Sequence, residues 1–132
     1  MTYALAYWCL LVLGVLPYVW IATAKAVAGT RYDNRDPRQW MARQQNPLAQ
    51  RAHAAHLNGL EAFPLIAAGL LMAQLAGVPA HTAAALMLAI TLARIAHGLC
   101  YIAGKAALRS LVWFVGLGCT LALFVLAALR VG

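Results

Sequence analysis

The sequence predicts an all-α protein, a four-helix bundle that crosses a membrane. Three observations support this prediction: an apolar composition, four long apolar runs and an uneven distribution of charge. Of the 132 residues, 64% are hydrophobic and only 10% are charged, and the mean hydropathy is +0.77. A soluble core cannot absorb so much apolar surface. We therefore expect one integral membrane domain over residues 1–132.

Each apolar run is long enough to cross a bilayer, which takes about 20 residues of helix. The runs cover residues 3–28, 48–76, 79–103 and 106–131. They are continuous and rich in Ala and Leu, whereas the strands of a membrane barrel alternate apolar and polar residues. The first run is too long for the apolar part of a signal peptide and has no basic segment before it. We therefore expect it to remain as a membrane helix.

Basic residues are concentrated in two of the three connections. The loop 29–47 holds four arginines, the link 103–106 carries Lys105, and the link 77–79 has no charge. The positive-inside rule places both basic connections in the cytoplasm and both termini outside, with Arg130 as one exception. Anionic membrane lipids account for most of the net charge of +7. No soluble module is left to bind nucleic acid.

Polar side chains within the second run form a stripe. Asn46 followed by Pro47 is a helix start signal, with Asn as cap and Pro at the first position. At 100° per residue, Arg51, Asn58 and Glu61 then fall on one stripe. His56 points almost opposite to Asn58.

The third run ends with Arg94, His97 and Tyr101 on a single helical face. In a hairpin about the link 77–79, Glu61 and Arg94 are level, each about 22 to 24 Å from the turn. Asn58 and His97 match one turn further along. We therefore expect a polar layer in the cytoplasmic half, with a charge-compensated pair of Glu61 and Arg94 at its centre. Arg109 can reach the same layer.

The sequence lacks the residue patterns that several classes of functional site require. The three cysteines lie inside apolar runs, and the four histidines have no Cys or carboxylate partners at metal-site spacing, so we expect no metal. Nucleophile elbows, phosphate loops and paired carboxylates are also missing, which excludes the common soluble enzyme classes.

The polar motifs resemble one family, the membrane-associated proteins in eicosanoid and glutathione metabolism (MAPEG). The resemblance rests on Ala-His56-Leu-Asn58-Gly-Leu-Glu61 at the start of the second helix and Arg94-Ile-Ala-His97-Gly-Leu-Cys-Tyr101 at the end of the third. The segment Arg31-Tyr-Asp-Asn-Arg-Asp-Pro-Arg38 is similar to the bacterial branch. The resemblance therefore implies a bacterial inner membrane.

This resemblance also implies a homotrimer that holds glutathione, as cosubstrate, between neighbouring subunits near the cytoplasmic face. The residues that match positions binding or bracing glutathione are Asn58, Glu61, Arg94, His97 and Tyr101. Arg109 and Ser110 match the pair at the start of the fourth helix, where the arginine stabilises the thiolate. Small residues favour close contact between membrane helices. The candidates for subunit contacts are Ala4, Gly14, Ala83, Gly98, Gly116 and Gly118.

The chain also departs from the eicosanoid branch. Glutathione-binding members of that branch carry Arg where this chain has Ala54 and Leu57, and Tyr where it has Trp113. Each lost charge-assisted hydrogen bond costs about 1.5 to 3 kcal/mol of binding. Either Arg51 or the arginines of the loop 29–47 are expected to replace part of this charge in the glutathione site.

The leading hypothesis is a glutathione-dependent transferase or peroxidase that acts on lipophilic electrophiles delivered by the membrane. A non-catalytic binder of lipids or of a partner protein, like the lipoxygenase-activating member of the family, remains an alternative that the missing arginines favour. A small transporter fits less well, because internal repeats and broken helices are absent.

Overall fold

A computed structural model describes residues 2–132 and contains helices but no strand in that range. The helices are α1 (Tyr3–Val27), α2 (Pro37–Ala42), α3 (Pro47–Leu75), α4 (Ala80–Ile102) and α5 (Ala106–Val131). Four of them are long and apolar enough to cross a membrane. The all-α class is therefore confirmed, and the four predicted spans agree with the observed helices to within one residue at each end.

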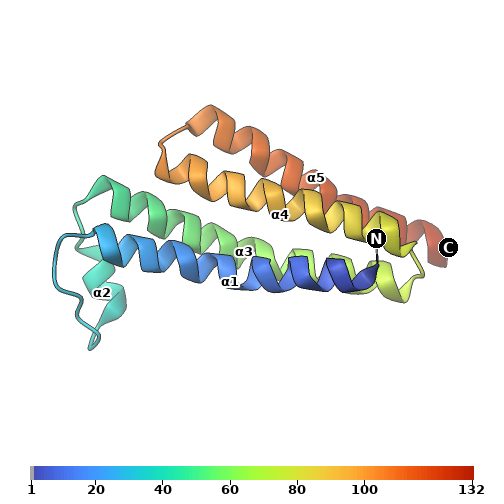
Figure 1. Ribbon diagram of the computed structural model, residues 1–132, viewed down its shortest axis with the longest axis horizontal. Helices are drawn as coiled ribbons and strands as arrows, with labels where there is room; N and C mark the ends of the chain where they lie inside the picture. The colour runs from blue at the N-terminus through green and yellow to red at the C-terminus, as the bar shows by residue number, and fades with distance from the viewer. Residues whose placement is uncertain (1) are drawn as a thin grey trace.

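The long helices form two antiparallel pairs (Figure 1). Helix α1 lies along α3, and α4 lies along α5. Both chain ends and the turn between α3 and α4 lie at one end of the bundle, while α2 and the turn between α4 and α5 lie at the other. The two basic connections therefore share an end, as the charge distribution predicts.

Arg130, the exception to that charge distribution, lies at the other end and has a local partner. Its Nη1 donates a hydrogen bond to the carbonyl of Gly77 at 3.0 Å, and Tyr3 donates to the carbonyl of Val78 at 2.7 Å. These bonds tie both terminal helices to the turn between α3 and α4. The Arg130 guanidinium thus helps to hold α5 against the turn between α3 and α4.

Helix α2 lies within the loop 29–47 and was not predicted. Its start repeats the signal seen at Asn46: the carboxylate of Asp36 accepts a hydrogen bond from the backbone of Gln39, and a proline occupies the first turn. Trp40 is buried against α1 and α3 and donates from Nε1 to the carbonyl of Arg31 at 2.8 Å. The basic loop is therefore folded onto the bundle end.

Most of the small residues predicted for subunit contacts pack within the chain instead. An added methyl group at Gly14, Gly98 or Gly116 would contact a side chain of the same subunit, and Ala83 is fully buried. Ala4 and Gly118 are exposed. Ala83, Gly98 and Gly116 are buried within one subunit, because its antiparallel helices need the same close approach, so these three do not form subunit contacts.

Gly98 lets α4 approach Trp20 of α1. A methyl group at residue 98 would lie 2.3 Å from Cζ2 of the buried indole, so Gly98→Ala should lower the free energy of unfolding by about 1 to 3 kcal/mol. Gly118→Ala meets no atom within 4 Å and should not destabilise the protein. Thermal unfolding in mild detergent compares the two, and equal melting temperatures would contradict this close packing.

Candidate functional site

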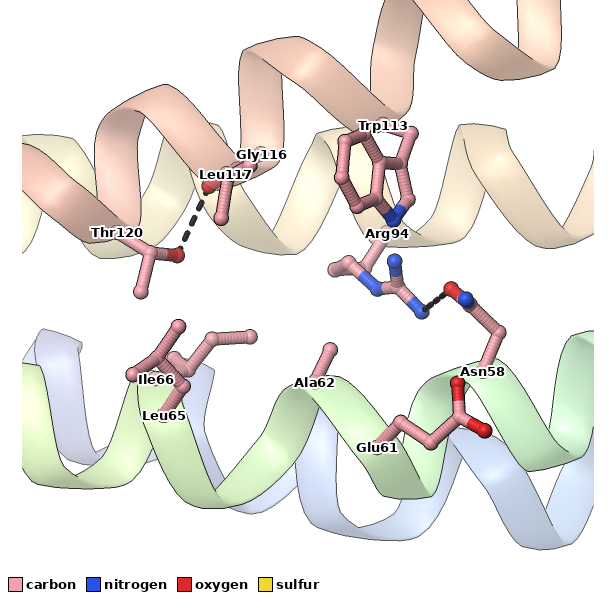
Figure 2. Close-up of a pocket in the computed structure, with 10 residues that line it drawn as sticks. All are labelled: Asn58, Glu61, Ala62, Leu65, Ile66, Arg94, Trp113, Gly116, Leu117 and Thr120. Atoms are coloured by element: carbon pink, nitrogen blue, oxygen red, sulfur yellow. Dashed lines mark hydrogen bonds between the residues drawn. The ribbon is translucent and has the colours of Figure 1, made fainter.

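Two adjoining cavities lie among α3, α4 and α5. The first has a volume of about 190 Å³ and the second about 290 Å³. Asn58 and Trp113 line both, so the two form one continuous candidate site. The first cavity is walled mainly by apolar side chains, such as Leu65, Ile66 and Leu117 (Figure 2). The second lies nearer the turn between α4 and α5 and is richer in polar groups.

Arg94 is the buried cation of the first cavity, with only 7% of its surface exposed. Its Nη2 donates a hydrogen bond to Oδ1 of Asn58 at 2.8 Å, across the gap between α4 and α3 (Figure 2). Every fully buried side-chain nitrogen or oxygen among residues 2–132 has a hydrogen-bond partner. The guanidinium nitrogens that do not contact Asn58 therefore keep some accessible surface, and Arg94 is one of the residues that line the first cavity.

The predicted pair of Glu61 and Arg94 is not formed within the chain. Both residues line the first cavity, but the hydrogen bond of Arg94 goes to Asn58, and Figure 2 draws no bond from Arg94 to Glu61. Asn58 and Glu61 differ by about 60° around the helix. Asn58 consequently faces α4, whereas the Glu61 carboxylate lies at the open edge of α3 and is exposed.

A run of contacts links the polar residues of the second cavity. His97, only 3% exposed, packs edge-on against Tyr101 with 5.1 Å between ring centroids. The guanidinium carbon of Arg109 lies 4.4 Å from the Tyr101 ring centroid, in a cation–π contact. Ser110 lines the same cavity. Arg109 thus reaches the polar layer, as the sequence predicts.

Arg51 is not brought to either cavity. Its guanidinium lies at the turn between α4 and α5, where a methyl group on Gly104 would come within 2.5 Å of Nη1. His56 lies on the opposite side of α3 from Asn58, as predicted, and its Nδ1 hydrogen-bonds the carbonyl of Pro17 at 2.8 Å. Leu57 is 45% exposed and lies outside both cavities.

Of the cavity residues on helix α5, the sequence had singled out Trp113 as a departure from the family but had not placed Gly116, Leu117 or Thr120 in the site. Trp113 stands between the two cavities, and Gly116, Leu117 and Thr120 extend the same wall (Figure 2). The Thr120 hydroxyl is buried and donates to the carbonyl of Gly116 at 2.8 Å. The spacing of three, four and seven residues from Trp113 is the helical signal that identifies this wall.

The hydrogen bond between Arg94 and Asn58 should stabilise the fold. Asn58→Ala leaves a buried charged donor unpaired and should lower the free energy of unfolding by about 1 to 3 kcal/mol. Combined with Arg94→Met, the loss should be smaller than the sum of the two single losses. Glu61→Gln with Arg94→Met is the control cycle and should be nearly additive. Thermal unfolding of the six proteins tests this, and coupling only in the Glu61 cycle would contradict the observed pairing.

Comparison with known proteins gives one match. No curated protein and no solved structure matched the chain. A model of the MAPEG family matches residues 5–129, nearly the whole sequence. The match includes α3 and α4, all but the outer two residues of α1 and of α5, and every residue that lines the two cavities. The chain is therefore an integral membrane protein and belongs to the MAPEG family.

Proposed function

We propose that this protein is a glutathione-dependent transferase or peroxidase that acts on lipophilic electrophiles. The observation that carries the proposal is the joined pair of cavities, one with Arg109 and other polar groups and one with mainly apolar walls. A hydrophilic thiol and an apolar acceptor need such neighbouring environments. Asn58 and Trp113 stand where the two environments meet.

The polar groups fit the chemistry of glutathione, which has two carboxylates, an ammonium group and a thiol. Arg94 is a cation in the wall of the first cavity, and Arg109 is a second cation in the adjoining one. The Glu61 carboxylate can form an ion pair with the ammonium group. Each cavity is smaller than the roughly 300 Å³ at which ligand pockets usually begin, so a tripeptide needs both cavities or a further wall.

Arg109 is the residue that we assign to thiolate stabilisation. It lies in the first turn of α5, so its charge adds to the positive end of the helix. The thiol proton leaves to solvent, the thiolate sulfur forms a bond to the electrophilic carbon, and the leaving group departs with the bonding electrons. Ser110 adjoins as a hydroxyl donor. His97 and Tyr101 brace Arg109 through the ring contacts described above.

The exposed position of Glu61 in the middle of α3 supports the proposal of a homotrimer. It is the middle residue of α3, about 21 Å from either end, and its side chain is exposed. A charge facing lipid at the centre of a membrane helix costs about 2.5 to 3.5 kcal/mol. A neighbouring subunit that covers Glu61 would remove this cost and supply the further wall. In this proposal the basic end faces the cytoplasm of a bacterial inner membrane.

One observation favours a second candidate, a non-catalytic binder of lipids or of a partner protein. Ala54 and Leu57 replace arginines, and Arg51 lies at the turn between α4 and α5, so it does not restore their charge in the cavities. The apolar cavity would then hold a lipophilic molecule without chemistry. Turnover with glutathione separates the two candidates.

Arg109→Ala should reduce conjugation of glutathione to a chromogenic electrophile by about 100- to 1,000-fold, because one preorganised contact to a developing anion contributes about 2.7 to 4 kcal/mol. Lys105→Ala is the matched control, since it removes a positive charge from the same end without touching either cavity. The rates are measured in the same detergent, together with the subunit number. Equal rates for Arg109→Ala and wild type would end the role of Arg109, and no wild-type rate with several acceptors would favour the non-catalytic binder.

The purified protein should be a trimer by native mass spectrometry in mild detergent. Glu61→Lys should lower the trimer fraction, because it reverses a charge that we place between subunits, whereas Lys105→Glu reverses a charge at the bundle end and should not. A wild-type protein that is monomeric under several mild conditions would remove the shared site.

A further inference from the structure

A small void lies between α1, α3 and α4 inside one subunit. Its volume is about 10 Å³, which is close to the roughly 10 to 15 Å³ that one buried water molecule needs. Four of its lining residues, Leu13, Leu16, Pro17 and Trp20, come from α1. Arg94 of α4 lines this void and also lines the first cavity of the candidate site. The same cation therefore borders two separate spaces.

Pro17 leaves one backbone carbonyl of α1 without its usual partner. In an α-helix the carbonyl of a residue accepts a hydrogen bond from the N–H four residues later, so the donor for Leu13 would be residue 17. Pro17 lies inside α1 and has no N–H to donate. No side chain among residues 2–132 donates to the Leu13 carbonyl in its place. Lipid offers no donor either, so the carbonyl needs another partner.

The freed carbonyl faces the void. Residues three, four and seven positions apart share one face of a helix, and the four α1 residues of the void have this spacing. The direction from the Leu13 carbonyl toward Pro17 runs along that face. On the α4 side, only Nη2 of Arg94 has a hydrogen-bond partner within the described chain, and the other guanidinium nitrogens keep some accessible surface. An acceptor and a charged donor thus belong to residues that border the same space.

We propose that the void binds one water molecule, which accepts a hydrogen bond from the Arg94 guanidinium and donates one to the Leu13 carbonyl. Ordered water is a known substitute for the donor that a proline removes from a membrane helix, and a buried water needs two to four polar partners. The water ties Arg94 to α1, while the direct bond to Asn58 ties it to α3. Arg94 is thereby held from two sides.

Pro17→Ala tests this proposal, because it returns an N–H to α1 that donates to the Leu13 carbonyl and so removes the acceptor of the water. Melting temperatures are measured in mild detergent for wild type, Pro17→Ala, Arg94→Met and the double variant. The restored helix bond stabilises both backgrounds, but only wild type also loses the bridge to Arg94. Pro17→Ala should therefore raise the melting temperature by about 2 to 8 °C more in the Arg94→Met background than in wild type.

Pro64→Ala is the matched control. Pro64 also lies inside a membrane-length helix, but it does not line the void. Its replacement should change the melting temperature by the same amount with Arg94 and with Met at residue 94. An equal effect of Pro17→Ala in the two backgrounds would overturn the proposal, because Pro17 and Arg94 would then be uncoupled.

Crystal structures of the wild-type protein and of Pro17→Ala give a direct second measurement. Wild type should show an ordered water within about 2.7 to 3.2 Å of both the Leu13 carbonyl oxygen and an Arg94 nitrogen, and Pro17→Ala should lose it. An empty void, or a direct bond from Arg94 to the Leu13 carbonyl, would overturn the proposal. Neither measurement involves glutathione, so the water site and the proposed enzymatic function succeed or fail separately.

Discussion

The rest of the structure depends on one constraint. A guanidinium that is buried deep in an apolar bundle must have a hydrogen-bond partner. Arg94 is 7% exposed and is held by one hydrogen bond to Asn58. A cation at this depth needs polar partners, because lipid offers none. That bond crosses from α4 to α3 and so fixes the height of one helix against the other. Arg94 and Asn58 both line the first cavity, so this bond also shapes the candidate site.

Helix α3 organises the molecule because its two polar faces serve different neighbours. Asn58 faces α4 and the candidate site, while His56 bonds the carbonyl of Pro17 in α1. The same helix thereby separates the candidate site from a groove between α1, α2 and α3 that is lined by Lys25, Arg38 and two histidines. The polar cavity of the candidate site lies toward the basic end of the bundle, whereas the apolar cavity extends to the middle of α3, where Glu61 lies.

Membrane spans are predictable because a single local quantity, apolar length, decides them. The four spans agree with the helices to within one residue at each end. The approach of Asn58, Arg94, His97, Tyr101 and Arg109 was also predictable, since helical rise and an antiparallel hairpin fix their relative heights. Helix α2 was missed because six residues make a weak periodic signal, although Asp36 and Pro37 repeat the start signal of α3.

By itself, the sequence determined the all-α class, the four membrane-length helices and the polar layer, because hydropathy and helical periodicity act within each segment. Only the tertiary structure decided that Arg94 bonds Asn58 and not Glu61, that Arg51 lies at the turn between α4 and α5, and that Trp113 joins two cavities. These contacts depend on how far each helix is rotated about its axis. A rotation of about 60° separates Asn58 from Glu61, and packing sets that rotation through close contacts such as that of Gly98 with Trp20.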